Sequence, residues 1–307
     1  MKNEISHSLP SRFREDINEE ELYELRIYKG QPITAVTKSG LRKLRGGSIS
    51  PFEFELTLNS IFQGSQYVYE EDLKQGFFTL HGCRIGVCAS AITEKGNITT
   101  VQHIRSLNIR FAHEIKGCAE DLYEKLGKSV NGGVLLAGPP GCGKTTLLRD
   151  LARLVSNSGK KVCIIDERSE IGALSEGISH MDLGCTTDIL DGYPKVKAFE
   201  IALRCLSPHV IICDEIGQAE SEAVLSCLNC GVDIVAAVHS DGTFSQKLST
   251  LTSDGGFRKV AFFQNGSVGK IERIVDFDNV KICDSDFCGA FNIFSRTARE
   301  PATLFKG

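Results

Sequence analysis

Residues 138–146 have the composition of a loop that binds the phosphates of a nucleotide. Glycines let backbone N–H groups close around phosphate oxygens, and a helix that starts at such a loop adds partial positive charge. Lys144 can reach the β- and γ-phosphates, and the Thr145 hydroxyl can bind Mg²⁺. The spacing therefore predicts that the chain binds a nucleoside triphosphate. The segment consists of Gly138, Pro139, Pro140, Gly141, Cys142, Gly143, Lys144, Thr145 and Thr146.

The sequence on both sides of this loop fits a strand before it and a helix after it. Residues 134–137 are all apolar, and residues 146–154 carry apolar side chains at helical spacing. A glycine-rich turn between a strand and a helix can also occur without a ligand. The complete eight-residue pattern, with both flanks in place, favours a phosphate-binding loop.

Two adjacent carboxylates follow a second apolar run, residues 209–213, which has the composition of a buried strand. The acids are Asp214 and Glu215, and at the carboxyl end of a parallel strand they would face the crevice where α/β sheets bind ligands. In phosphoryl transfer one acid can hold Mg²⁺, directly or through water, and another can deprotonate the attacking water. We predict the first role for Asp214 and the second for Glu215. A solvated loop after a strand is the alternative.

Other polar residues also follow apolar runs. His239 ends residues 232–238, a run expected to lie beside the two acids, and we predict that it senses the γ-phosphate. Arg168 lies in the charged segment 166–170 after another such run, where it could contact Mg²⁺, water or a neighbouring subunit. Arg204 could balance the charge of the triphosphate or simply lie on a helix.

The nucleotide is predicted to be ATP. Residues 214–217 fit the D-x-x-G pattern of GTPases, but no N-K-x-D segment follows that would recognise guanine. Hydrolysis often needs a cation from outside the core to stabilise charge on the γ-phosphate. The candidates are Arg168 and, from the amino-terminal part, Arg105 and Arg110.

The composition excludes some classes of protein. The net charge of −4 offers no general attraction for nucleic acid. The longest apolar runs are too short to cross a bilayer, and the first residues lack the apolar core of a signal peptide. Twelve cysteines include one C-x-x-C pair, Cys227 and Cys230, but a zinc site needs further ligands at suitable spacing. We therefore expect a cytoplasmic protein with reduced thiols.

The chain divides into two parts by the pattern of its strands. Residues 1–115 contain alternating strands around turns and are predicted to form a small α+β domain. Residues 116–307 contain near-continuous apolar strands between helices, which predicts an ATPase domain with a mostly parallel sheet covered on both faces. The predicted helices are 11–26, 52–60, 119–127 and 219–230, and the predicted strands include 76–82, 83–88, 161–166, 209–213, 232–238 and 270–275.

Together these segments resemble the stage III sporulation protein AA family, a relative of the secretion ATPases of type II and type IV systems and of pilus motors. The resemblance implies a P-loop NTPase core of the RecA-like, secretion-ATPase type. In it, 166–170 would be the aspartate box, 210–215 the Walker B strand and His239 the histidine box. The wider family usually has Gly-Glu where this chain has Asp214-Glu215. The matching segments are 24–27, 86–88, 106–110, 138–146, 166–170, 187–195, 203–208, 210–217 and 236–240.

The resemblance also implies an activity and partners. It implies a Mg²⁺-dependent ATPase that works as a hexameric ring, is peripheral at a membrane, and serves a secretion-like channel between mother cell and forespore. A nucleic-acid-dependent ATPase is an alternative, since RecA-like cores also power helicases, but the net charge and the absence of a basic stripe argue against it. Glu215 and His239 argue against a scaffold that binds nucleotide without hydrolysis.

Overall fold

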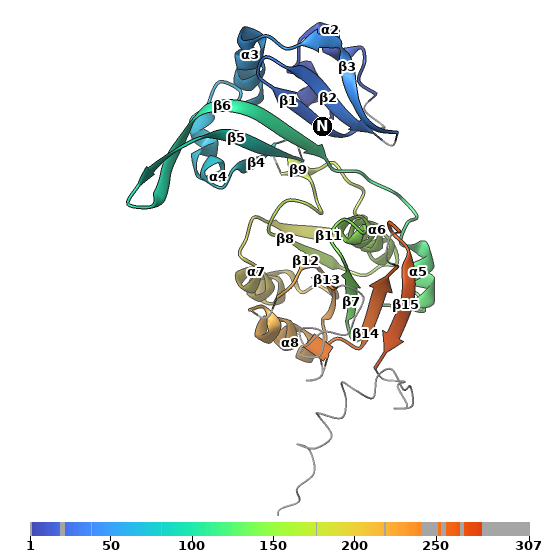
Figure 1. Cartoon of the computed structure of the whole chain (residues 1–307). Coiled ribbons are helices and arrows are strands. Elements are labelled where there is room, and N and C mark those ends of the chain that lie inside the picture. Colours follow the sequence, from blue (N-terminus) through green and yellow to red (C-terminus); the bar gives the residue numbers. More distant parts are fainter. Residues whose placement is uncertain are drawn as a thin grey trace, which may run out of the picture.

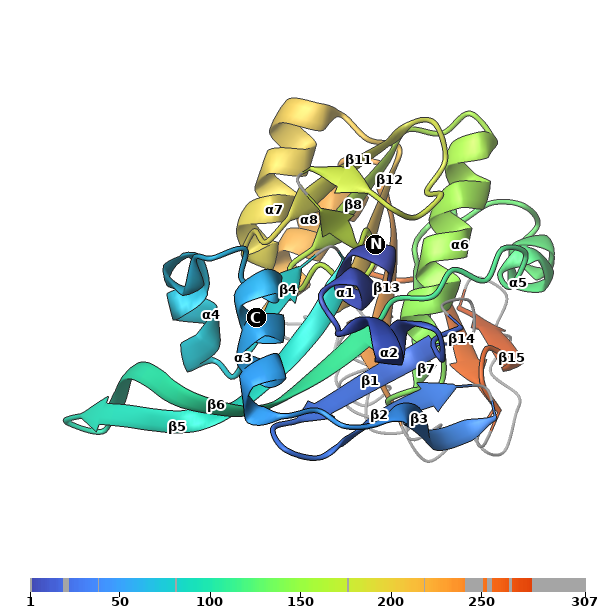
Figure 2. The ribbon, with the colours of Figure 1, turned by 90° about the horizontal axis from the view of Figure 1, so that it is seen from above.

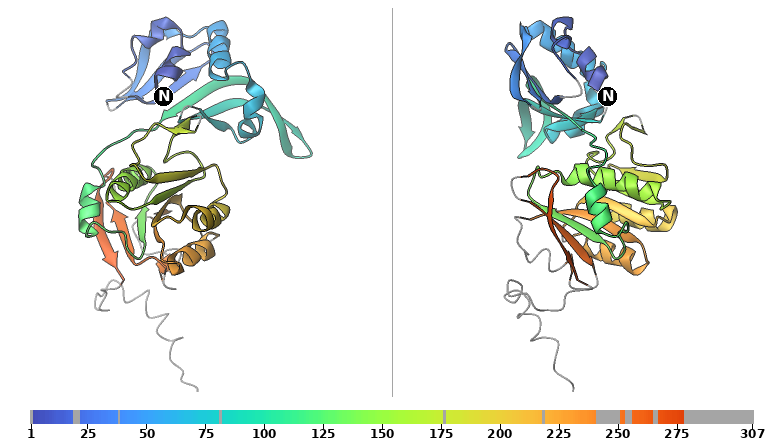
Figure 3. Two further views of the ribbon diagram at one scale, coloured as in Figure 1. Left: turned by 180° about the vertical axis from the view of Figure 1, so that it is seen from behind. Right: turned by 90° about the vertical axis from the view of Figure 1, so that its right-hand side faces the viewer.

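The described residues form two large sheets, each with its own hydrophobic packing, and the part with the amino-terminal sheet lies above the part with the second sheet in Figure 1 (see also Figure 3, right). A backbone stretch without regular structure, residues 112–117, runs between them. The separate cores support a domain boundary near residue 115, which stays a prediction. The computed structural model describes residues 2–18, 22–37, 39–80, 82–175, 177–217, 219–240, 251–252, 256–264 and 267–277.

The amino-terminal sheet is antiparallel, with its strands in the order β3-β2-β1-β6-β5-β4. Helices pack on it through a core that includes Phe13, Ile27 and Phe54. Helix α3 begins with a capping box, in which Ser50 and Glu53 satisfy each other's backbone N–H groups. The elements are α1 (Lys2–His7), α2 (Ser11–Arg14), β1 (Leu22–Tyr28), β2 (Pro32–Thr37), β3 (Gly40–Ser48), α3 (Pro51–Ile61), a 3₁₀ turn (Gln66–Tyr69), α4 (Glu70–Lys74), β4 (Phe77–Leu80), β5 (Cys83–Glu94) and β6 (Asn97–Phe111).

Strands β5 and β6 extend beyond the rest of this sheet as a two-stranded arm (Figures 1 and 2). At the other end of the arm, Cys83 of β5 pairs with Phe111 of β6 beside the linker to the second sheet. The hairpin of β5 and β6 therefore runs from the tip of the arm to the start of the linker that leads to the second sheet.

The second sheet has the order β11-β8-β12-β13-β7-β14-β15 and is parallel except for the pair β14–β15. The carboxyl ends of its parallel strands therefore meet at one edge, where open α/β sheets bind ligands. Its elements are α5 (Glu120–Lys125), β7 (Val134–Gly138), α6 (Lys144–Asn157), β8 (Val162–Asp166), β11 (Thr187–Asp191), α7 (Lys195–Ile201) with a π-helical turn (Ala202–Leu206), β12 (Val210–Glu215), α8 (Ser221–Asn229), β13 (Asp233–His239), β14 (Lys259–Phe263) and β15 (Ile271–Asp276). A two-residue ladder joins β9 (Leu174–Ser175) to β10 (Ile178–Ser179).

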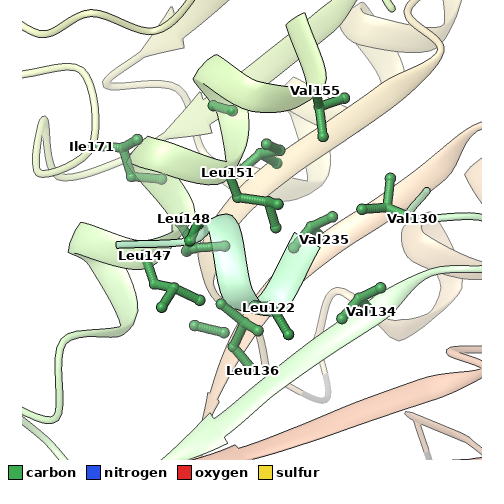
Figure 4. Packing of buried hydrophobic residues seen from close by; sticks show 14 of the residues in the cluster. Leu122, Val130, Val134, Leu136, Leu147, Leu148, Leu151, Val155, Ile171 and Val235 are labelled. Atoms are coloured by element: carbon green, nitrogen blue, oxygen red, sulfur yellow. The ribbon is translucent and has the colours of Figure 1, made fainter. Parts of the chain in front are cut away.

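Helices cover both faces of this sheet, as the near-continuous apolar strands predict. Helices α5 and α6 cover one face, where Leu148 and Leu151 of α6 pack with Leu136 of β7 (Figure 4). Helices α7 and α8 cover the other face, which includes Phe199 and Cys213. Alternate residues of each strand thus belong to the α6 face or to the α7 face. No helix in the described ranges is both long and apolar enough to cross a membrane.

The predicted strands and helices are found with shifts of a few residues, except that β5 continues to Glu94 where the predicted strand ended at residue 88, and that one helix is absent. The helix predicted over 11–26 is wrong, because α2 ends at Arg14 and β1 begins at Leu22. Leu22, Leu25 and Ile27 are buried in the core between the sheet and its helices. Pairing of β1 with β2 and β6 stabilises the extended backbone more than the charged local sequence stabilises a helix.

Candidate functional site

A pocket of about 400 Å³ lies at the carboxyl edge of the parallel sheet. The register between β13 and β7 brings two parts of the pocket wall together, because His239 at the end of β13 pairs with Gly138 at the end of β7. All the side chains to which the sequence assigned catalysis or metal binding line this pocket. Its wall consists of Pro140, Gly141, Gly143, Lys144, Thr145, Thr146, Arg168, Glu170, Asp214, Glu215, Ala237, His239 and Val268.

The predicted phosphate-binding segment, residues 138–146, connects β7 to α6 in a conformation that requires its glycines. Gly143 is the N-cap of α6 with a φ of +98°, in the left-handed region that glycine tolerates best. At Gly138 an added Cβ would lie 2.8 Å from Cys142 Sγ and 2.9 Å from Phe263 Cβ. The loop therefore packs tightly, and the N-terminus of the 14-residue helix α6 opens at the pocket.

The Lys144 side chain lies along the inside of this loop. Its ammonium donates hydrogen bonds of 2.8 Å to the carbonyl oxygens of both Gly138 and Pro139. It also lies 3.5 Å from Nδ1 of His239. Burial lowers the pKa of Lys144, and nearby negative charge only partly offsets that effect. The loop thus holds the lysine at the pocket wall.

A bulge in β12 decides where the two adjacent acids point. Cys213 pairs with Ala236 of β13, but Glu215 pairs with Ala237, so Asp214 is the extra residue. Without the bulge, simple alternation after Cys213 would turn Asp214 toward the α6 face and Glu215 toward the α7 face. The bulge shifts that alternation by one residue, as such irregularities do beside many active sites. Glu215 therefore shares the α6 face with Ala237.

Glu215 contacts the histidine that the sequence placed beside it. Its Oε2 atom lies 3.0 Å from Nε2 of His239, which in turn faces Lys144 through Nδ1. The chain of contacts connects the end of β12, the end of β13 and the phosphate-binding loop. The carboxylate is half-buried, so it remains accessible from the pocket. A group placed in this way can accept a proton from water bound there.

The Asp214 side chain points away from Glu215, toward the start of α7, and contacts a lysine to which the sequence analysis assigned no role. Its Oδ1 atom lies 2.9 Å from Nζ of Lys195, and both side chains are buried. Burial raises the pKa of Asp214 despite this neighbour. Burial acts to lower the pKa of Lys195, but the hydrogen bond and charge of Asp214 outweigh it and raise the pKa. The assignment of Asp214 to Mg²⁺ stays a prediction.

Lys195 gives no sequence signal of its own, because it follows Pro194 as the first residue of α7 and resembles any solvated helix start. Arg84 was missed for a similar reason. It lies on β5 of the other domain, yet its guanidinium is 2.7 Å from Oε1 of Glu170 at the pocket wall. Contacts between residues so far apart in the chain leave no local pattern.

The proposed arginines are in different positions. Arg168 lines the pocket and is exposed. Arg110 lies 3.5 Å from Glu24 in the amino-terminal sheet, and Arg105 lines another hollow, beside Lys29. Arg204 is exposed on the π-helical turn and does not line the site. Of these four, Arg168 is the one that this fold brings to the predicted nucleotide within one chain.

Comparison with known proteins identifies the family. A family model described as "Sporulation stage III, protein AA" matches residues 3–276. The chain belongs to this family. It is 34% identical over 294 residues to Stage III sporulation protein AA of Bacillus subtilis (strain 168), an alignment that covers 90% of this chain and 95% of that protein. The resemblance inferred from the motifs is confirmed.

Solved structures of ATPases share the fold. The X-ray structure of the Legionella pneumophila ATPase DotB has a TM-score of 0.55 at 20% identity, covering 78% of this chain and 72% of that one. The crystal structure of the pilus retraction motor PilT with bound ADP has a TM-score of 0.55 at 14% identity, covering 80% and 74%. The predicted fold class, a P-loop NTPase core of the RecA-like, secretion-ATPase type after a small α+β domain, is confirmed.

The loop that carries Arg168 is shaped by a buried carboxylate. Asp166 has no exposed surface and accepts hydrogen bonds of 2.7 to 2.9 Å from the backbone N–H groups of Glu170, Ile171 and Gly172. Burial raises the pKa of Asp166 to about 6, although these three donors act in the opposite direction. Asp166 thus holds the backbone of residues 170–172, next to Arg168, and is not among the residues that line the pocket.

Replacing Asp166 by Asn is expected to lower the free energy of unfolding by about 1–3 kcal/mol, because an amide NH₂ would then face a backbone N–H donor. Urea denaturation of the full chain measures this difference. Asp188→Asn, an exposed carboxylate on the neighbouring strand β11, is the matched control and should leave stability unchanged. Equal stability of Asp166→Asn and the wild type would contradict the role given to Asp166.

Proposed function

We propose that this protein is a Mg²⁺-dependent ATPase that works as a ring-forming motor. The observation that carries the proposal is the pocket in which the phosphate-binding loop and Lys144 face Glu215 and His239. The pilus retraction motor PilT, which shares the fold, was solved with bound ADP, and this supports the proposal that the present chain also binds an adenine nucleotide. Thr145 and Asp214 are the oxygen donors proposed for Mg²⁺, which prefers such hard ligands.

The chemistry follows from the positions of these residues. The triphosphate lies against the loop and the N-terminus of α6, and the Lys144 ammonium exchanges its loop carbonyls for phosphate oxygens. Glu215 accepts a proton from water as the water oxygen bonds to the γ-phosphorus. The bond from the γ-phosphorus to the bridging oxygen breaks, and ADP and phosphate form. Bound Mg²⁺ would neutralise charge on the phosphates.

His239 is proposed to report the γ-phosphate to Glu215. Its two ring nitrogens face different partners, since Nε2 lies near Glu215 and Nδ1 lies near Lys144. Any movement of Lys144 toward a phosphate therefore changes the partners available to the imidazole. This arrangement connects the occupied loop with the orientation of the general base.

The cellular role is proposed from the family. Its description names stage III of sporulation, and its fold is shared with the pilus retraction motor PilT. We propose that a ring, hexameric in the simplest case, powers assembly of or transport through a secretion-like channel between mother cell and forespore. In this role the protein lies in the cytoplasm and binds the membrane through protein partners.

Phosphate release and oligomeric mass together test this function. We expect ATP hydrolysis that requires Mg²⁺ and that DNA or RNA does not stimulate. A non-hydrolysable ATP analogue should shift the mass, measured by light scattering, from protomer to ring. Concentration-independent activity of a monomer would exclude the ring motor, and stimulation by nucleic acid would favour the nucleic-acid-dependent alternative.

Arg168 lines the pocket of its own chain and is exposed, and we propose that in a ring it also reaches the nucleotide of a neighbouring subunit. Arg168→Ala should depress hydrolysis without altering the melting temperature, since arginine fingers contribute about 10³–10⁵-fold to phosphoryl transfer. Mixing this variant with Lys144→Ala should restore part of the activity through hybrid interfaces. Confirmed hybrid rings without any rescue would exclude the trans role of Arg168.

A further inference from the structure

Lys195 is a buried lysine beside the site that the chemistry above does not use. Its Nζ atom lies 2.9 Å from Oδ1 of Asp214 and 3.6 Å from Oε2 of Glu167, and it donates a hydrogen bond to the main-chain carbonyl of Glu215. The side chain is only 8% exposed. One ammonium from the start of α7 thus joins the ends of two neighbouring strands, β8 and β12.

The bond to the Glu215 carbonyl lies where β12 leaves the regular ladder. The pairing of β12 with β8 ends at Cys213 opposite Ile165, just before the bulge at Asp214. On the other side of β12, the backbone N–H of Ile216 donates to the carbonyl of Ala237 at 3.0 Å. Lys195 therefore supplies a donor on the β8 side, and the backbone around Glu215 is held from both sides.

This double attachment fixes the direction of the Glu215 side chain. The bulge is needed to turn Glu215 to the α6 face, where its carboxylate meets His239 at 3.0 Å. A bulge leaves a residue out of the ladder and lets the strand bend. Lys195 contacts both the bulged residue, through the carboxylate of Asp214, and the residue after it, through the carbonyl of Glu215.

We propose that Lys195 is a positioning residue that holds the bulged end of β12 so that Glu215 faces His239 and the pocket. Asp214 and Glu167 compensate the charge of the buried ammonium. This inference rests on the proposed ATPase function for its effect on rate, but the geometry that it describes exists without nucleotide. Lys195 thus determines the orientation of the general base from a helix on the opposite face of the sheet.

The test separates this role from simple charge compensation of Asp214. Lys195→Met alone leaves a buried carboxylate unpaired, so the informative comparison is Lys195→Met/Asp214→Asn against Asp214→Asn, both at saturating Mg²⁺. We expect kcat to be about 10- to 100-fold lower in the double variant, since a misplaced catalytic group costs about that much. The Kd for ATP should be equal in the two variants, because both carry Asp214→Asn and they differ only at Lys195, which lies outside residues 138–146.

A spectroscopic readout does not depend on hydrolysis. The ¹⁵N resonances of the His239 imidazole, assigned by comparison with His239→Gln, should move in the double variant and stay in place in Asp214→Asn. Lys197→Met is the matched control, because Lys197 lies on the same helix, is exposed and pairs with Glu200. It should change neither kcat nor these resonances.

The outcomes are distinct. Equal kcat and unmoved His239 resonances in the double variant would overturn the proposal and leave Lys195 as the counter-ion of Asp214. Moved resonances in a protein that does not hydrolyse ATP would support the positioning role and exclude the proposed function instead. If the double variant does not fold, Lys195→Gln/Asp214→Asn replaces it, since the glutamine amide can bond Asn but ends one bond short of the lysine nitrogen. The same measurements of kcat and of the His239 ¹⁵N resonances then test the positioning role.

Discussion

Lys144→Ala is expected to weaken ATP binding by at least about 100-fold, because hydrogen bonds to charged groups contribute roughly 1.5–3 kcal/mol each and the lysine can reach two phosphates. The backbone of the loop and the N-terminus of α6 remain, so residual weak binding should persist. Titration with a fluorescent ATP analogue measures the Kd.

Folding must be checked in parallel, since Lys144 also donates to the carbonyls of Gly138 and Pro139. The matched control is Lys160→Ala, an exposed lysine beyond the end of α6, which should bind ATP like the wild type. If the folded Lys144→Ala protein kept its wild-type Kd, the assignment of residues 138–146 to the nucleotide would be wrong.

Glu215→Gln is expected to slow hydrolysis by roughly 10²–10⁴-fold, the usual contribution of a positioned general base. Glutamine has the same size and can still hydrogen-bond to His239, but it cannot accept the proton of the attacking water. ATP affinity should therefore stay within a factor of about two of the wild type. Single-turnover phosphate release and an equilibrium titration on the same preparation measure both quantities.

Asp214→Asn provides the comparison, since it removes the neighbouring carboxylate, at the bulge itself, and leaves Glu215 unchanged. It should weaken Mg²⁺-dependent nucleotide binding more than it lowers the rate at saturating Mg²⁺, because it removes negative charge near the proposed metal. The same loss of rate and of metal affinity in both variants would contradict the different roles proposed for Asp214 and Glu215.

The sequence by itself determined the fold class and the position of the site. Glycines at fixed spacing, followed by Lys144, specify a phosphate-binding loop because few other residues tolerate its backbone conformation. Apolar runs that end in Asp214, Glu215 and His239 predict that these residues meet at one edge, since parallel strands all end on the same side of a sheet. Both inferences need only local patterns and a general rule of sheet geometry.

Tertiary structure decided which way the acids face. Alternation along β12 predicts the wrong faces for Asp214 and Glu215, because the bulge depends on pairing with β13 and on Lys195 from α7. The contact of Arg84 with Glu170 also joins distant segments. Register and packing between distant segments set these contacts, and a one-residue shift in a strand moves a side chain to the opposite face. Local sequence therefore specifies which residues reach the pocket edge, and only the assembled sheet specifies what each of them contacts.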